Sequence, residues 1–175
     1  MKGKATITTA RYQSPCGELV VGILEDKICL CDWECRPNHL QILQRVGRRL
    51  GAKVEEREER DRREERVLTE AFRQLTEYFQ GNRKEFELPL LMAGSEFQKE
   101  VWRALVDLPY SATVSYTDIA ERIRKPSAVR AVANAIGANP LSILIPCHRV
   151  IGKNGAMTGY AGGIDKKEFL LRVEK

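Results

Sequence analysis

The segment Ile143-Leu144-Ile145-Pro146-Cys147-His148-Arg149-Val150-Ile151-Gly152 is the most informative part of this 175-residue chain for its expected fold and chemistry. It begins within an apolar run, residues 141–145, which lies between two prolines and is therefore expected to be buried. The run leads to Cys147, and His148 follows directly, so an imidazole can accept the thiol proton, directly or through a water, and expose a thiolate. An isolated Cys-His pair is more often structural, so the surrounding sequence has to distinguish a nucleophile from a core thiol.

Three helices are expected just upstream of this stretch. Ser95 and Gln98 form a capping-box signature before an apolar stripe, which predicts a helix to about Leu108. A second box predicts a shorter helix, and a third helix follows after Lys125-Pro126 and ends before Asn139-Pro140. Two short helices across a tight turn predict a helix-turn-helix. The expected starts of the second and third helices are Ser115, with Asp118 as its box partner, and Ser127.

The first half of the chain has the pattern of a small sheet with helices on it. Residues 5–34 alternate and are rich in β-branched residues, which predicts a meander of about three strands. Apolar spacing predicts amphipathic helices over 39–50, with Gly51 as the C-cap, and over 67–79. Residues 55–66 carry charges of both signs and no apolar side chain, so a solvated loop or an exposed helix face is expected there.

These elements predict a mixed α/β chain of the α+β type with two lobes. An extended connector is expected over residues 86–91, and the boundary is placed after it. The N-terminal lobe, residues 1–92, is expected to hold an antiparallel sheet plus helices. The C-terminal lobe, residues 93–175, is expected to be mostly helical and to contain the helix-turn-helix.

Composition restricts the classes of partner and compartment. The net charge is +5, and residues 93–175 contain 12 Lys and Arg against 8 Asp and Glu, so the excess suits a polyanion at that lobe. Five cysteines in a chain without a secretory pattern at Met1-Lys2-Gly3-Lys4 and beyond predict reduced thiols and a cytoplasmic protein. No apolar run approaches the length of a membrane span, so no membrane partner is expected.

Residues 143–152 closely resemble the active-site signature of the O6-alkylguanine-DNA alkyltransferases, a highly specific motif. The resemblance extends over essentially all of the C-terminal lobe, whereas in the N-terminal lobe only residues 14–19 and the following strands are similar. The further matching segments are Phe97 to Leu108, Val114-Ser115-Tyr116, Ala128 to Pro140, Gly159 to Gly163 and Lys167 to Leu171.

The resemblance implies a hydrogen-bonded catalytic set. Cys147 would accept the alkyl group, His148 would relay the thiol proton, and Glu174 would hold the imidazole in the required tautomer. Asn139 would bond backbone near the site and brace the turn before the cysteine. The alternative for Glu174 is a solvated terminal acid, the usual fate of a penultimate residue.

The resemblance also implies how DNA is bound. The partner would be double-stranded DNA, approached through the minor groove by the second helix of the helix-turn-helix, with the alkylated base flipped out. Arg130 would fill the gap in the stack, and Tyr116 would disfavour the normal position of the nucleotide and donate a hydrogen bond to guanine N3. Val150 and Ala161 would offer backbone groups to the base, and Thr117 belongs to the same binding set. A monomer without a cofactor is expected.

The implied reaction is an in-line displacement at the alkyl carbon that consumes one protein per alkyl group. Two alternatives come from other classes. A lesion-binding protein would keep the flipping residues but lack the cysteine, and Cys147 is present. A thiol hydrolase would turn over repeatedly, because a thioester hydrolyses readily whereas the thioether formed by alkyl transfer is inert.

Two further features of the sequence concern metal binding and the size of the pocket. Cys29, Cys31, Cys35 and His39 lie close in sequence, but they contain no Cys-x-x-Cys pair, and the two strand cysteines are expected on one face, so no metal is predicted. Ser142 is small and polar, which raises the hypothesis of a roomier pocket that also accepts O4-alkylthymine.

Overall fold

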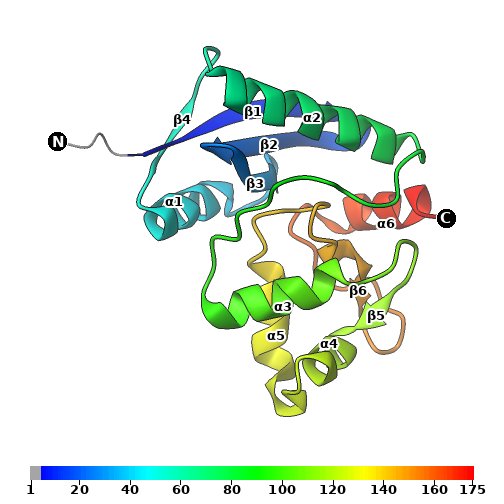
Figure 1. Ribbon diagram of the computed structural model, residues 1–175. Coiled ribbons are helices and arrows are strands. Elements are labelled where there is room, and N and C mark those ends of the chain that lie inside the picture. The colour runs from blue at the N-terminus through cyan, green and yellow to red at the C-terminus, as the bar shows by residue number, and fades with distance from the viewer. Residues whose placement is uncertain (1–4) are drawn as a thin grey trace.

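The computed structural model describes residues 5–175. Residues 1–4, part of the segment for which no secretory leader is predicted, lie outside the described residues. The N-terminal half forms a four-stranded sheet in the order β3-β2-β1-β4 (Figure 1). The predicted meander is confirmed, since β1, β2 and β3 pair antiparallel through tight turns. The strands are β1 (Thr6–Ser14), β2 (Gly17–Leu24), β3 (Lys27–Trp33) and β4 (Lys53–Glu56).

Strand β4 corrects the expectation of a solvated segment from residue 55. Residues 53–56 pair in parallel with Thr6–Thr9 of β1. Val54 packs against the smaller of the two hydrophobic cores, which includes Ile7, Ile42 and Val46. The charged side chains of Glu55 and Glu56 can stay near water because β4 lies at the edge of the sheet. Its partner strand lies more than forty residues earlier, so no local pattern predicts the pairing.

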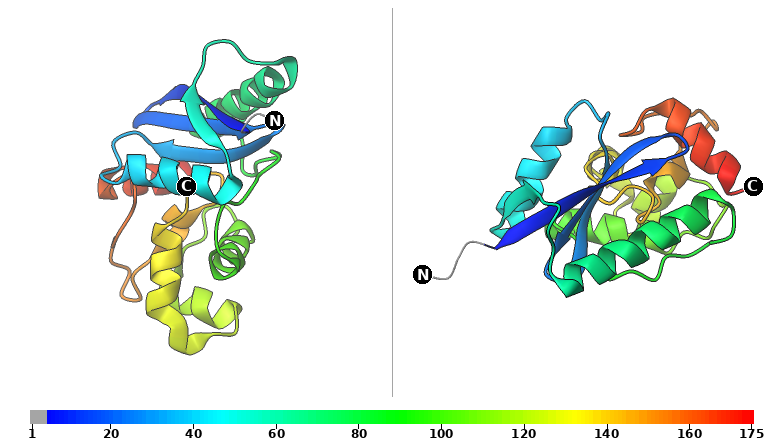
Figure 2. Two further views of the ribbon diagram at one scale, coloured as in Figure 1. Left: turned by 90° about the vertical axis from the view of Figure 1, so that its left-hand side faces the viewer. Right: turned by 90° about the horizontal axis from the view of Figure 1, so that it is seen from above.

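Helices α1 (His39–Leu50) and α2 (Arg62–Phe79) cover opposite faces of this sheet (Figure 2). The predicted helix 39–50 and its left-handed Gly51 cap are confirmed. Helix α2 begins five residues earlier than predicted, because Asp61 forms a capping box with Glu64 and so starts the helix within the charged segment. Alternation along β2 directs Val20 to the core under α1 and its neighbours to the core under α2.

The C-terminal half is mostly helical, as predicted, and the two expected capping boxes at Ser95 and Ser115 are both present. Ser127 is not a cap: it lies inside a 3-10 turn, and the following helix begins at Val129 without a side-chain cap. Pro126 at the start of that turn leads the chain into it. The elements are α3 (Glu96–Val106), β5 (Val114–Ser115), α4 (Tyr116–Arg122), η1 (Pro126–Ala128), α5 (Val129–Gly137), η2 (Cys147–Arg149), β6 (Val150–Ile151) and α6 (Ile164–Val173).

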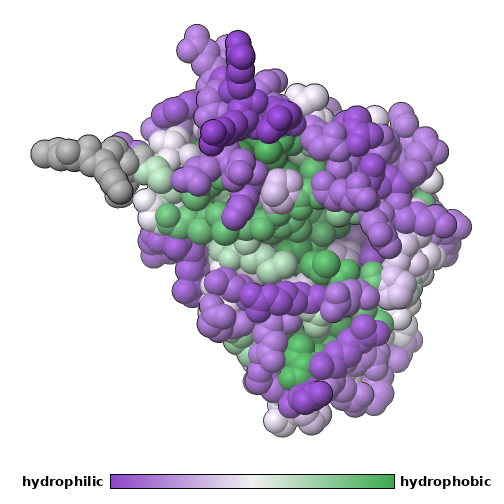
Figure 3. All heavy atoms as spheres, viewed as in Figure 1, coloured by the Kyte–Doolittle hydropathy of each residue, from purple (hydrophilic) through white to green (hydrophobic). Residues whose placement is uncertain are grey.

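Strand β3 joins the two halves through its outer edge. Ile28 exchanges backbone hydrogen bonds with the connector at Pro89 and Leu91, both 2.8 Å, and further along Cys31 N–H donates to Pro140 O at 2.8 Å. The larger core accordingly contains side chains from both halves. Apolar residues gather in a band between α2 and the C-terminal helices on the face seen in Figure 3. The segment that leads to Cys147 is therefore anchored on the sheet.

Mixed strands and helices in this arrangement confirm the α+β class. Within residues 5–175 no helix combines the length and the apolar character that a membrane crossing needs.

Candidate active site

Cys147 begins the short helix η2 at the end of a buried turn. Asn139 braces that turn: its Nδ2 donates to Ile145 O at 3.0 Å, and its Oδ1 accepts from Leu141 N–H at 2.9 Å. Ile143 within the turn has φ +71°, a conformation costly for a β-branched residue and held here by the surrounding bonds. The cysteine nucleophile expected from the sequence therefore lies on a rigid support.

The Cys147 thiol is buried, and burial raises its pKa, although Asn139 and the cations Arg36 and Lys167 act in the opposite direction. The raised pKa keeps the thiol protonated at neutral pH, so a base has to remove its proton when it reacts.

His148 and Glu174 form a fully buried pair. The imidazole Nε2 lies 2.6 Å from Glu174 Oε1. Burial lowers the pKa of His148, so the ring is neutral at neutral pH. An ionised carboxylate can only accept a hydrogen bond, so Nε2 carries the ring proton and Nδ1 keeps a free electron pair. Among residues 5–175 this Nδ1 has no hydrogen-bond partner, which leaves it available as a base.

Glu174 is 1% exposed, so the alternative of a solvated terminal acid is wrong. Arg149 donates to it from Nε (2.9 Å) and from Nη2 (3.0 Å), and Tyr78 OH donates to Oε1 at 2.7 Å. Burial alone would raise the pKa of Glu174, but the hydrogen bonds from His148 and Arg149 outweigh it and lower that pKa to about 2. The carboxylate is therefore ionised across the physiological range.

A cavity of about 420 Å³ opens beside Cys147, between the N-terminal lobe, helix α5 and the glycine-rich loop formed by residues 152–163. Its lining residues are Arg36, Pro37, Asn38, Tyr116, Ala133, Asn134, Ile136, Gly137, Cys147, Gly159, Tyr160 and Ala161. Ser142 is fully buried and lies outside this lining set, so it does not itself widen the cavity.

Buried contacts position the glycine-rich wall of the cavity. Lys167 is 0% exposed, and its Nζ donates to Val150 O (2.6 Å) and Thr158 O (2.8 Å). Trp33 of β3 donates from Nε1 to Tyr160 OH at 3.1 Å. A Cβ on Gly162 would lie 2.5 Å from the Trp33 ring, so only glycine allows this approach.

The predicted DNA-binding residues fall into two groups. Tyr116 and Ala161 line the cavity, and Val150 is buried in β6, which pairs with β5 beside it. Tyr116 OH donates to Thr158 O at 3.2 Å, and Thr117 follows it, half-buried, in the first turn of α4. Arg130 lies outside the cavity, exposed near the start of α5 on the helix-turn-helix.

Sequence reasoning missed several residues that contact this site or line it: Arg36, Tyr78, Arg149, Tyr160 and Lys167. Arg149 and Lys167 lie inside the matching segments, where their charge in an apolar context was a usable signal. The signal was absent for Tyr78, because its position in an amphipathic stripe is that of an ordinary core residue.

The side chains of Cys29, Cys31, Cys35 and His39 do not come together as one group of metal ligands. A register shift between Gly22 and Ile23 makes Cys29 a bulge residue, so Cys29 and Cys31 belong to different cores rather than to one face. His39 Nδ1 lies 2.9 Å from Asp32 Oδ2 instead. No group of potential metal ligands is found within residues 5–175.

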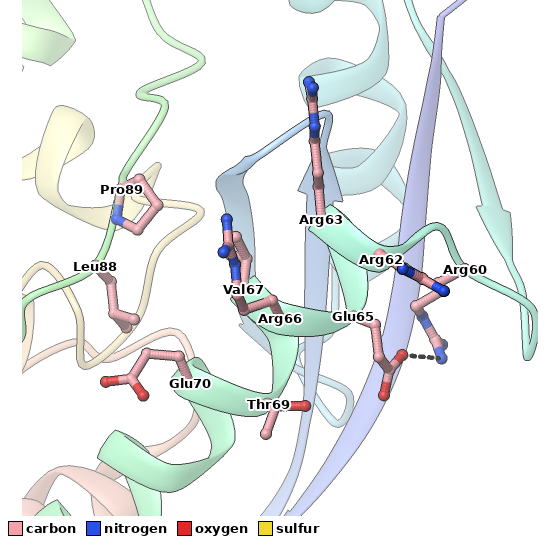
Figure 4. Close-up of a pocket in the computed structure, with 10 residues that line it drawn as sticks. All are labelled: Arg60, Arg62, Arg63, Glu65, Arg66, Val67, Thr69, Glu70, Leu88 and Pro89. Carbon is pink, nitrogen blue, oxygen red and sulfur yellow. Dashed lines mark ion pairs between the residues drawn. The ribbon is translucent and has the colours of Figure 1, made fainter.

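A larger depression, about 1010 Å³, lies between the first turns of α2 and the connector (Figure 4). Arginines dominate its wall, with Val67, Leu88 and Pro89 as the apolar part, and Glu65 pairs with Arg60 at 4.0 Å. Its lining contains no cysteine or histidine, so the smaller cavity at Cys147 is the candidate active site.

Two family models match the chain. They are described as "6-O-methylguanine DNA methyltransferase, ribonuclease-like domain", over residues 7–92, and "6-O-methylguanine DNA methyltransferase, DNA binding domain", over residues 96–175.

Known proteins agree with the models. A constitutive methylated-DNA–protein-cysteine methyltransferase of Bacillus subtilis (strain 168) is 42% identical over 174 residues, 96% of this chain and 94% of the relative. The inducible enzyme of that organism is 57% identical over 102 residues, 58% of this chain, which spans 57% of that relative. The structure of Mycobacterium tuberculosis OGT in complex with DNA aligns with a TM-score of 0.77 and 34% identity, covering 97% and 92% of the two chains. The chain therefore belongs to the methylated-DNA–protein-cysteine methyltransferases, a family that repairs DNA, as the Cys147 segment predicted.

Proposed function

We propose that this protein removes an alkyl group from O6 of guanine in DNA and keeps it on Cys147, once per molecule. The observation that carries the proposal is a buried thiol at the wall of a base-sized cavity, next to a neutral imidazole whose free Nδ1 is held in place through Glu174. A cavity of about 420 Å³ suits a single small ligand.

The chemistry follows from these groups without a cofactor. His148 accepts the proton of the Cys147 thiol, directly or through a water, and Glu174 stabilises the imidazolium. The thiolate attacks the alkyl carbon in line, so a sulfur–carbon bond forms as the bond from that carbon to guanine O6 breaks. The electron pair leaves with guanine, which then takes up a proton. The product is a thioether, which does not hydrolyse, so the protein is consumed.

Binding to duplex DNA brings the base to the thiol. The proposed route is the minor groove, where the small residues of α5 permit close approach and exposed Arg130 enters the base stack. Tyr116 would exchange its bond to Thr158 O for one to the flipped base, while Thr117 and the backbone of Val150 and Ala161 complete the binding set. Because one chain contains the whole set, we propose a monomer, acting in the reducing cytoplasm where its five free cysteines persist.

Intact mass and peptide mapping after incubation with a duplex containing one O6-methylguanine test the proposal directly. One methyl group on Cys147, stopping at one equivalent and absent from Cys147→Ala, is the expected result. A duplex that binds while neither Cys147 nor the lesion changes would make the protein a lesion-binding module. Repeated turnover would point to a thiol hydrolase.

Activity on O4-alkylthymine is a second, narrower proposal, and the size of the cavity supports it. The test is a competition between duplexes carrying O4-methylthymine and O6-methylguanine. Comparable transfer rates are expected, and no detectable reaction of the thymine lesion would refute the idea.

A further inference from the structure

Tyr78 brings a hydroxyl from the N-terminal lobe into the catalytic set. It lies in the last turn of α2, whose C-terminal end approaches α6 in Figures 1 and 2. Its hydroxyl donates to Glu174 Oε1 at 2.7 Å and lies 3.4 Å from His148 Nε2. The side chain is 0% exposed, and its ring packs on Phe79 and Phe86 at centroid distances of 5.4 Å.

The Tyr78 hydroxyl does more than satisfy its own hydrogen-bonding requirement in the protein interior. Glu174 Oε1 already accepts from His148 and from Arg149 Nη2, so Tyr78 supplies a third donor to the same oxygen that faces the imidazole. Burial and the adjacent carboxylate raise the pKa of Tyr78, so the hydroxyl keeps its proton and stays a donor.

We infer that Tyr78 is a positioning residue for alkyl transfer, which holds Glu174 Oε1 against the imidazole and withdraws negative charge from it, so that His148 stays neutral and able to accept the Cys147 proton. The inference rests on the proposed function for its kinetic consequence. It assigns to the N-terminal lobe, which contains none of the reacting atoms, a direct effect on His148 as the general base.

The sign of the effect follows from the charges around the ring. His148 is faced by Glu174 and Lys167 from α6 and its end, by Arg149 from η2 and by Tyr78 from α2. Of these, Glu174 alone stabilises the imidazolium. Removing the tyrosine hydroxyl leaves more negative charge on Oε1, so the pKa of His148 rises. Because transfer requires the neutral ring, the acid limb of the rate profile then moves to higher pH.

Tyr78→Phe removes the hydroxyl and keeps the ring packing. Tyr12→Phe is the matched control, since Tyr12 bonds Thr76 on the same helix at 3.0 Å, remote from the pair. Methyl transfer to Cys147 is timed by rapid quench and intact mass between pH 5.5 and 9. In parallel, ¹⁵N NMR of the free proteins follows the imidazoles, and because the chain has two histidines, His39 is an internal reference.

For Tyr78→Phe we expect the acid limb to move up by about one pH unit, hence about a tenfold slower transfer below it and a nearly unchanged rate above it. The His148 ring signals should move towards the protonated form at a higher pH than in the wild type, while those of His39 and all signals of Tyr12→Phe stay unchanged.

An unshifted acid limb together with unshifted His148 signals would overturn the inference, and so would a rate loss equal at every pH, which indicates a structural role alone. If Tyr78→Phe does not fold, the pair is tested by substituting fluorotyrosine, a stronger donor, which should shift His148 the opposite way. If the wild type fails to methylate Cys147, the proposed function fails, and the NMR comparison still decides the effect of Tyr78 on His148.

Discussion

Glu174 has an environment that is unusual for a penultimate residue. It lies at the end of α6, fully buried, and its two oxygens accept from His148, Arg149, Tyr78 and the backbone N–H of Ser111. A buried carboxylate is tolerated only when donors of this kind compensate for lost hydration. Glu174 thus contributes to the candidate active site as well as to the core.

Replacing Glu174 by Gln should slow methyl transfer by about 100-fold, because the amide no longer holds the imidazole in the tautomer with Nδ1 free. The pKa of about 2 also predicts a pH dependence. Because the pKa of Glu174 is lower in the folded protein than in the unfolded chain, the ionised carboxylate stabilises the fold at any pH above its unfolded pKa. This contribution, about 3 kcal/mol at most, is lost as the pH falls towards 2. Urea unfolding of both proteins should therefore give stabilities that converge between about pH 4.5 and 2; a constant difference would contradict the assignment.

At the scale of elements, the two ends of helix α5 differ in their contacts with the rest of the molecule. It is rich in alanine, and its last turn contains no basic side chain to compensate for the helix dipole. Arginines of the N-terminal lobe supply that compensation: Arg36 donates to Gly137 O and Asn139 O, and Arg45 donates to Ala138 O. The sheet lobe therefore fixes the end of the helix nearest the turn before Cys147, while Arg130 near the start of the helix is exposed.

Ala131→Leu on the exposed face of α5 should weaken duplex binding by about tenfold or more, because a larger side chain prevents the helix from entering a narrow groove. Stability should change by no more than about 0.5 kcal/mol, since the site is exposed. Gln41→Leu, which adds the same side chain to the exposed face of α1, is the control. Fluorescence anisotropy with a labelled duplex measures both, and equal affinities would refute minor-groove docking by α5.

At the scale of the whole molecule, the lobes share their larger core, in which Trp33 of the sheet and Trp102 of α3 are both fully buried. The division of the chain after residue 92 stays a prediction about its architecture. A common core nevertheless predicts that neither half unfolds alone.

Urea unfolding followed by fluorescence should show one cooperative transition. Each lobe contains one of the two tryptophans, so Trp33→Phe and Trp102→Phe leave a single reporter in the other lobe. Circular dichroism gives the unfolding midpoint of the whole fold for each variant. In each of the two variants, the midpoint followed by fluorescence should coincide with the midpoint followed by dichroism. A fluorescence midpoint that departs from the dichroism midpoint in either variant would indicate independent lobes.

Salt should weaken DNA binding in proportion to the few exposed cations on the helix-turn-helix. Arg122, Arg124 and Arg130 are exposed and free of ion pairs among the described residues. With about three phosphates neutralised, affinity should fall about 40-fold between 50 and 200 mM salt. Each arginine replaced by alanine should reduce the slope by about one. A salt-independent affinity would place the duplex elsewhere on the molecule.

Features that short-range sequence patterns encode could be predicted without a structure. Capping boxes at Ser95 and Ser115, the Gly51 cap and the adjacent Cys147 and His148 all lie within a few residues of their partners, so helix starts, ends and the family motif could be predicted. Steric and hydrogen-bond rules at such spacing act before any tertiary contact forms.

Contacts between groups that are distant in the sequence could be known from the three-dimensional structure alone. Strand β4 pairs with β1 from far along the chain, the bulge at Cys29 separates it from Cys31, and Tyr78 reaches Glu174 across 96 residues. The burial of Glu174 also depends on elements from both halves. Burial and long-range pairing set its pKa and the free Nδ1 of His148, and these depend on surroundings that no local pattern contains.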